Sequence, residues 1–272
     1  MSFLIAVFYG VVQGITEFLP ISSTAHLTIM QIFFPNALRM GGNFDAFSTS
    51  LHLGTALAVV LFFIKDWIKL ITAGISKPSS KDGRFFWLLV AATVPAGLGG
   101  LLLSPFKEKF INNIYIIGSV LIIMGIVLYF TDKFGKNEVS KHENIGFING
   151  VLIGASQIIA MIPGVSRSGI TISTGRFLGV NRESAAKFAF MLSSPIILLD
   201  GLYELYKGGF TQVITDAGTL NFFTAIITSF ITGIIVIKFL LELLKKKSFL
   251  PFAVYRIVAG VVIIVAWIFI NK

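Results

Sequence analysis

The segment GVVQGITEFLPISSTAH, residues 10–26, contains the features from which the fold of this chain can be predicted. It is apolar enough to enter a lipid bilayer, yet it holds Gln13, Glu17 and Pro20 within one short segment. Proline interrupts a helix, and the backbone groups that it frees need partners that lipid does not provide. We therefore expect residues 3–38 to form a broken, re-entrant pair of short helices that is buried in protein or lines a cavity.

A second stretch, PGVSRSGIT at residues 163–171, has the same character. It lies inside an apolar region, residues 145–180, and it combines a proline and two glycines with Arg167. An arginine beside helix breakers does not belong on a lipid-facing helix. The sequence therefore predicts a second re-entrant broken-helix region over residues 145–180.

The composition of the whole chain points to a membrane. Of 272 residues, 55% are hydrophobic and 13% are charged, whereas a soluble domain carries about 25% charged residues. The absence of cysteine excludes a disulfide scaffold, thiol catalysis and thiolate metal sites. Lysine and arginine, which give the net charge of +9, cluster between apolar runs. This pattern is typical of the cytoplasmic loops of membrane proteins, so we expect no nucleic-acid partner.

Six further stretches are long and apolar enough to cross a bilayer, which takes about 20 residues. They are residues 51–71, 85–103, 114–131, 185–206, 220–244 and 252–270. The predicted fold is an all-α polytopic membrane protein with six transmembrane helices plus two re-entrant broken-helix regions. We expect residues 1–272 to form a single integral membrane domain.

The chain also repeats itself at a constant spacing. GVVQGITE, residues 10–17, aligns with GVLIGASQ, residues 150–157. Each half, 1–132 and 145–272, then holds one broken region followed by three spans. Because three is odd, the second half must enter the membrane from the opposite side, which makes an inverted-topology repeat. Such folds place their sites where discontinuous helices of the two halves meet.

The basic residues of the loops predict the orientation. One side of the membrane collects the lysines and arginine of residues 65–84, 133–141 and 245–247, and the other side holds only four lysines. The richer side is expected in the cytoplasm. The chain is thus predicted to be a multi-pass protein of the cell membrane with both termini outside.

Glu17 and Gln13 are the first candidates for chemistry. They lie four residues apart, so their side chains share one face of a helix. Two oxygen donors at this spacing suit a hard divalent cation such as Mg²⁺ or Ca²⁺. The alternative is a buried Gln–Glu hydrogen-bonded pair without metal.

Hydroxyl groups and an imidazole follow directly after Pro20. The residues concerned are Ser22, Ser23, Thr24 and His26. A serine becomes a nucleophile when a neighbouring base takes its proton, and His26 or Glu17 is close enough in sequence to do so. The structural alternative is a helix cap, which we expect of one of the two serines in any case.

The second region has the features of an anion site. Glycines such as Gly164 let backbone N–H groups approach an anion, and a following helix N-terminus adds a favourable dipole. Arg167 contributes a charged fork that matches phosphate oxygens. Further donors come from Ser166, Ser168 and Thr171. Pairing of Arg167 with Glu17 alone is the other interpretation.

Four more polar residues are expected in less specific settings. We expect His52 to line the mouth of the cavity, to be solvated or to pack in the core, and Asp200 to reach the membrane interface. We expect Arg176 to bind lipid headgroups or mark a boundary, and His142 to be solvated.

The two motifs, residues 13–26 and 163–171, resemble the two signatures of the bacterial undecaprenyl-diphosphate phosphatases, the bacitracin-resistance family. The second matches in full, and the resemblance covers essentially the whole chain. Gln13 stands where many members have glutamate, which removes one negative ligand. Ala25 replaces a common glycine.

The resemblance implies removal of the terminal phosphate of undecaprenyl diphosphate, which yields the undecaprenyl phosphate carrier of cell-wall synthesis. Its partners would be that isoprenoid diphosphate and membrane lipid, and its site would open outward. A homodimer stays open. The rival predictions are a transporter of a small anion and a lipid flippase that uses the same site without hydrolysis.

We assign the catalytic roles within this frame. Arg167 would hold the transferred phosphoryl group, and the hydroxyls and glycine already named would surround it. Glu17, with Gln13, would hold the cation or act as base. Ser23 is the expected nucleophile, activated by His26 or Glu17, with Ser22 second. Direct attack by water with His26 as base stays open.

Overall fold

The structure, a computed structural model, describes residues 1–34, 44–111, 113–206 and 209–270. Within these ranges the chain forms twelve α-helices, two short 3-10 helices and one isolated β-bridge between Val139 and Val180. The predicted all-α fold is confirmed. Residues 35–38, the end of the first predicted broken region, lie outside the described residues.

The first half of the chain begins with a pair of short helices, and longer helices come after it. These helices are α1 (Phe3–Phe18), α2 (Ser23–Phe33), α4 (Phe44–Phe62), α5 (Ile64–Ser76), α6 (Lys81–Ile111) and α7 (Ile114–Phe134). After the 3-10 helix η2 (His142–Asn144), the second half contains α8 (Phe147–Ser156), the 3-10 helix η3 (Gln157–Met161), α9 (Arg167–Phe177), α10 (Arg182–Tyr206), α11 (Gly209–Ala217), α12 (Thr219–Leu244) and α13 (Leu250–Ile270).

Four of the predicted spans are confirmed as helices long and apolar enough to cross a membrane, namely α7, α10, α12 and α13. The predicted span 85–103 lies within the longer helix α6. The span predicted at 51–71 differs, since the chain bends there by 72° between α4 and α5. The bend falls just before Lys65 and Asp66, where charged side chains begin and the chain leaves apolar surroundings.

The two broken regions are helix pairs, as predicted. α1 ends at Phe18 and α2 begins at Ser23, while α8 with η3 ends at Met161 and α9 begins at Arg167. Each break is preceded by an apolar helical segment that is shorter than a full span, namely α1 and α8 with η3.

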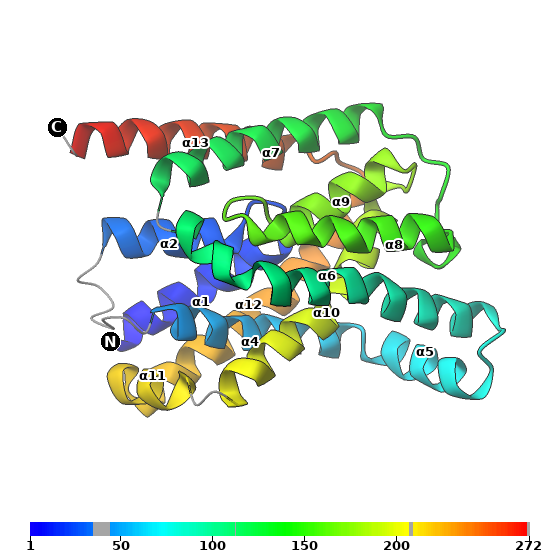
Figure 1. Cartoon of the computed structure of the whole chain (residues 1–272), viewed down its shortest axis with the longest axis horizontal. Coiled ribbons are helices and arrows are strands. Elements are labelled where there is room, and N and C mark those ends of the chain that lie inside the picture. Colours follow the sequence, from blue (N-terminus) through cyan, green and yellow to red (C-terminus); the bar gives the residue numbers. More distant parts are fainter. Residues whose placement is uncertain (35–43, 112, 207–208, 271–272) are drawn as a thin grey trace.

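Each broken region packs on a span from the other half of the chain. α1 lies along α12, α8 lies along α6, and α7 pairs with α13 (Figure 1). Glycines permit the first two contacts, because a Cβ on Gly14 would lie 2.6 Å from the Cβ of Thr232 and one on Gly154 would collide with the backbone of Ala92. This exchange of partners agrees with two related halves, although the boundaries 1–132 and 145–272 stay a prediction.

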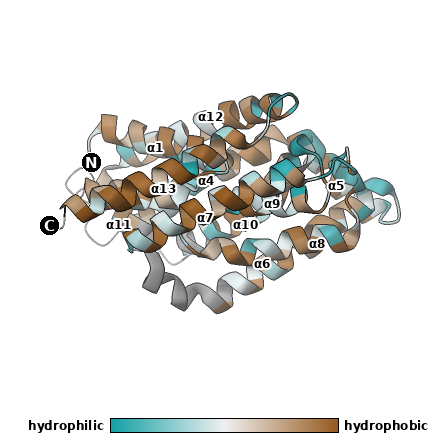
Figure 2. Cartoon of the chain, turned by 90° about the horizontal axis from the view of Figure 1, so that it is seen from above, coloured by the Kyte–Doolittle hydropathy of each residue, from teal (hydrophilic) through white to brown (hydrophobic). Residues whose placement is uncertain are grey.

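One end of the bundle is strongly polar. Figure 2 shows the hydrophilic residues gathered near α5, and Figure 1 places both termini at the opposite end. At the polar end, Asp132 of α7 accepts from Arg182 of α10 at 2.7 Å and from the main-chain N–H of Phe249 at 2.9 Å, so it connects α7 to α10 and to the segment before α13.

Two sequence expectations at this end were wrong. Arg176 does not face lipid headgroups, because its side chain is buried, its Nε lies 3.3 Å from Asp132 Oδ1, and its terminal nitrogens donate to main-chain carbonyls. His142 is buried rather than solvated, and its ring packs edge-on against Phe85. The polar neighbours of His142 in the sequence indicate a solvated loop, whereas the fold covers both residues with distant segments.

Candidate active site

A cavity of about 50 Å³ lies where the two broken regions meet. Its lining consists of Glu17, Ser22, Ser23, Thr24, His52, Ala160, Ile162, Gly164, Ser166 and Arg167. Most of the residues singled out in the two motifs therefore face one small space, although they lie about 140 residues apart in the chain.

Ser22 and Ser166 start the second helix of each broken pair in the same way. They are the non-glycine residues of the described chain with positive φ, at 77° and 72°. Each side chain caps its helix, with Ser22 Oγ accepting from the N–H of Ala25 and Ser166 Oγ from the N–H of Gly169. The cap expected of one serine thus belongs to Ser22. The next residue in each loop, Ser23 or Arg167, becomes the first residue of a helix and lines the cavity.

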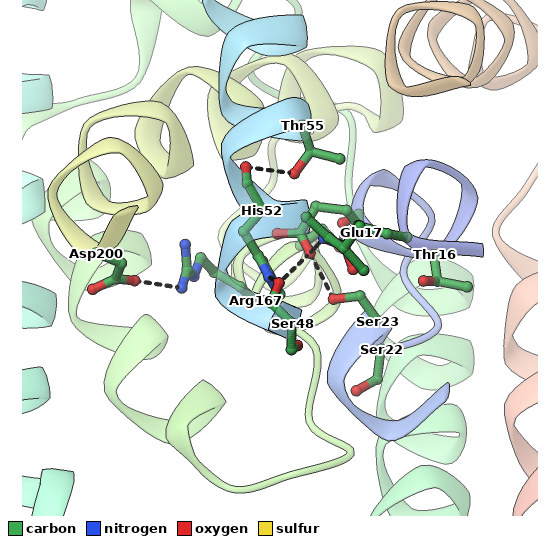
Figure 3. A network of polar contacts seen from close by, with 12 residues as sticks. Thr16, Glu17, Ser22, Ser23, Ser48, His52, Thr55, Arg167 and Asp200 are labelled. Atoms are coloured by element: carbon green, nitrogen blue, oxygen red, sulfur yellow. Dashed lines mark hydrogen bonds and ion pairs between the residues drawn. The ribbon is translucent and has the colours of Figure 1, made fainter. Parts of the chain in front are cut away.

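Glu17 is the centre of the polar network (Figure 3). Its Oε2 accepts a hydrogen bond of 2.6 Å from Ser23 Oγ and one of 3.1 Å from Gln13 Nε2. The Gln–Glu hydrogen bond weighed from the sequence is therefore present. A carboxylate that already accepts the serine proton is well placed to act as the base for that serine.

His52 of α4 also contacts Glu17, a contact that was not predicted from the sequence. Its Nε2 lies 3.3 Å from Glu17 Oε2, and its Nδ1 lies 2.7 Å from the carbonyl oxygen of Ser48. A carbonyl only accepts, so Nδ1 carries a proton, and a favourable contact of Nε2 with the carboxylate requires a second one. The geometry therefore places one proton between His52 Nε2 and Glu17 Oε2. The signal in the sequence was a histidine within an apolar span.

Arg167 lies on another wall of the cavity and pairs with Asp200. The distance from Nη2 to Asp200 Oδ2 is 3.4 Å, and Figure 3 shows this contact beside the Glu17 network. Nη1 is buried and has no hydrogen-bond partner among the described residues. Because the Asp200 side chain is 59% exposed, the arginine connects the cavity to the surface while it keeps a free donor.

The chain matches the family described as bacitracin resistance protein BacA over residues 6–262, a range that includes both broken regions. This chain belongs to the BacA family. Three similar relatives are each named undecaprenyl-diphosphatase. The protein from Pelotomaculum thermopropionicum is 43% identical, with 97% of each chain covered. Those from Caldicellulosiruptor bescii and Desulforudis audaxviator are both 41% identical, with 95% and 94% of each chain covered.

Four predicted site residues of this BacA family member lie off the cavity wall, namely Gln13, His26, Ser168 and Thr171. Ser168 Oγ donates to the carbonyls of Glu17 and Leu19 at 3.1 and 3.3 Å, so it holds the two loops together. Thr171 bonds to the carbonyl of Arg167 within its own helix.

His26 is turned toward α13 instead. Its Nδ1 lies 2.7 Å from the carbonyl of Ser22, and its Nε2 lies 2.6 Å from the hydroxyl of Tyr255. Since Nδ1 donates to the carbonyl, Nε2 accepts from the tyrosine. Both ring nitrogens of His26 thus have hydrogen-bond partners, and these bonds connect the Ser22 loop to α13.

The donor set fits a divalent cation that arrives with a phosphorylated substrate. No cluster of three or more histidine, aspartate or glutamate side chains that could hold a metal occurs in the described part of the chain. However, Gln13 Oε1 is a buried oxygen without a donor, and it belongs to the residue that contacts Glu17. Mg²⁺ is commonly held by one or two carboxylates together with substrate phosphates, and this BacA site offers one carboxylate.

Proposed function

We propose that this protein hydrolyses the terminal phosphate of undecaprenyl diphosphate and releases undecaprenyl phosphate. The observation that carries the proposal is the 2.6 Å hydrogen bond from Ser23 to Glu17 in a cavity shared with Arg167. It is supported by membership of the BacA family and by the printed names of the relatives.

The chemistry begins at the Ser23 hydroxyl. Its oxygen attacks the terminal phosphorus while its proton passes to Glu17 Oε2, and the bond from that phosphorus to the bridging oxygen breaks. Undecaprenyl phosphate leaves with the bridging oxygen. Water then attacks the phosphorus of the phosphoserine, and the bond from that phosphorus to Ser23 Oγ breaks. The serine oxygen takes back the proton held by Glu17, and the phosphate leaves with the protons of the water. The paired His52 keeps Glu17 oriented and balances its negative charge before the proton arrives.

Binding of the diphosphate falls to Arg167 and the helix ends. The unpartnered Nη1 of Arg167 is a buried donor without an acceptor, and a phosphoryl oxygen would supply one. The N-termini of α2 and α9 both begin at the cavity wall, where aligned N–H groups favour an anion. Phosphoryl transfer is catalysed mainly by such positioning and charge stabilisation.

A divalent cation, Mg²⁺ or Ca²⁺, belongs to this proposal. Gln13 Oε1, together with the Glu17 carboxylate oxygen that does not accept from Ser23, would hold it with the diphosphate. When bound, the cation would neutralise charge on the phosphoryl oxygens.

The orientation follows from the distribution of charge. We place the polar end near α5 in the cytoplasm and both termini outside, on the basis of the positive-inside rule. Asp200 lies in the C-terminal part of α10, which runs toward the end that holds the termini, so the pair of Arg167 and Asp200 would open the cavity outward.

The decisive experiment measures phosphate release from a C55 isoprenyl diphosphate by protein purified in detergent. We expect release by the wild type that EDTA suppresses and that Arg167→Ala and Glu17→Ala abolish. A folded wild type that binds the lipid without releasing phosphate would instead support the flippase, which would then be tested by lipid movement in proteoliposomes.

A further inference from the structure

Arg256 of α13 is a buried cation whose three hydrogen bonds all go to main-chain carbonyls. Its side chain is 0% exposed. Nη1 donates to the carbonyl of Pro20 at 2.8 Å, and Nη2 donates to those of Gly164 and Val165 at 2.6 and 3.0 Å. The described residues provide no carboxylate partner for it, so its charge is not neutralised locally.

These three carbonyls belong to the loops that break the two re-entrant pairs. Pro20 comes two residues before Ser22, and Gly164 and Val165 come directly before Ser166. Both serines have positive φ, a conformation that is unfavourable for a non-glycine residue and persists only where the surroundings enforce it. The Arg256 guanidinium therefore bonds to the main chain one or two residues before each of the two strained serines.

Tyr255, the neighbour of Arg256, ties down one loop only. Its hydroxyl donates to His26 Nε2, and His26 Nδ1 in turn donates to the carbonyl of Ser22. The same turn of α13 thus provides a contact shared by both loops and a separate contact to the first. This difference supplies a matched control.

We infer that Arg256 is a positioning residue that clamps the two loops together, so that Ser23 and Arg167 face the same cavity. The planar fork suits this task, since two terminal nitrogens reach carbonyls of two loops at once. The consequence for catalysis rests on the proposed function, but the clamp itself does not. Loss of the clamp would let both loops leave their strained conformations and would separate nucleophile from phosphate binder.

The test is amide hydrogen exchange on the detergent-purified chain, read in peptides that cover residues 19–26 and 162–170. We expect Arg256→Gln to speed exchange in both peptides. Arg256→Lys should speed exchange in at least one of them, because an ammonium lacks the planar fork. Tyr255→Phe should speed exchange in the first peptide only. Exchange in α12 serves as the internal reference for an intact bundle.

Activity provides the second readout. Misplacement of reacting groups by about 1 Å costs on the order of 100-fold in rate, so Arg256→Gln should lower kcat about 10- to 100-fold with a smaller change in KM. Unchanged exchange in both loops of a folded Arg256→Gln protein would overturn the proposed clamp. If the glutamine variant does not fold, the same comparison is made with Arg256→Lys. If the wild type releases no phosphate while both loops still loosen, the proposed function fails and the clamp stands.

Discussion

Ser23 Oγ and Glu17 Oε2 lie 2.6 Å apart across the break between α1 and α2. The short loop after α1 turns the chain back, so that a residue six positions later meets the carboxylate. Gln13 and His52 contact the same oxygen, which fixes its direction. Contacts from three residues therefore hold the carboxylate in place beside the Ser23 hydroxyl.

The first prediction concerns this pair. Ser23→Ala removes the proposed nucleophile, and Glu17→Gln removes the proposed base while it keeps the shape of the side chain. Because general base catalysis contributes about 10²–10⁴-fold, we expect each variant to lower kcat by at least about 100-fold. Mass spectrometry of the acid-quenched reaction should detect phosphate on the peptide that contains Ser23.

Glu143→Gln in the polar loop is the matched control for Glu17→Gln, and it should keep the wild-type rate. Full activity of Ser23→Ala, together with an unmodified peptide in the wild type, would move the attack from serine to water.

The second prediction concerns His52. His52→Gln keeps an N–H donor near Glu17, whereas His52→Leu leaves the carboxylate without this partner. Loss of a hydrogen bond to a buried charged group costs about 1–3 kcal/mol, so the leucine variant should lose about 5- to 150-fold in kcat and the glutamine variant clearly less. Steady-state phosphate release measures both. Equal losses would mean that the ring itself, rather than its donor, is required.

The site residues that the sequence predicted are polar or charged residues within apolar segments of the chain. Glu17 and Arg167 stand out as charges beside helix breakers in apolar surroundings, and the breaks themselves followed from prolines and glycines. Ser23 followed from its neighbours. Local patterns of this kind need no knowledge of which helices meet.

The residues that the sequence did not place depend on contacts between distant segments. His52 meets Glu17 only because α4 packs near α1, and Asp200 meets Arg167 only through the fold. Arg256 sits in a segment predicted simply as a span, and its carbonyl partners lie 236 and 92 residues away. No periodicity within one helix reveals such partners.

The third prediction tests the close packing of the broken helices. Gly154→Ala would drive a methyl group into the backbone of Ala92, whereas Gly97→Ala would meet nothing within 4 Å. Overpacking costs about 1–3 kcal/mol, so Gly154→Ala should lower Tm in detergent. Gly97→Ala should leave Tm unchanged or raise it, because alanine favours a helix. Equal Tm values for the two variants would contradict the tight contact of α8 with α6.

The last prediction is a dependence of stability on pH through His142, which lies outside the spans. Burial, together with the nearby Lys187 ammonium, lowers the pKa of His142 to about 4, whereas an unfolded histidine titrates at about 6.5. Between these values the unfolded chain binds more protons than the folded chain, so the free energy of unfolding rises with pH across this window. Acidification from pH 7 to pH 5 should therefore lower the free energy of unfolding by about 2 kcal/mol through this residue, as the two pKa values require.

Unfolding measured at both pH values in wild type and His142→Gln checks this, since the variant lacks the titrating ring. The variant should lose less stability than the wild type on acidification, and equal losses would show that His142 is not the group responsible.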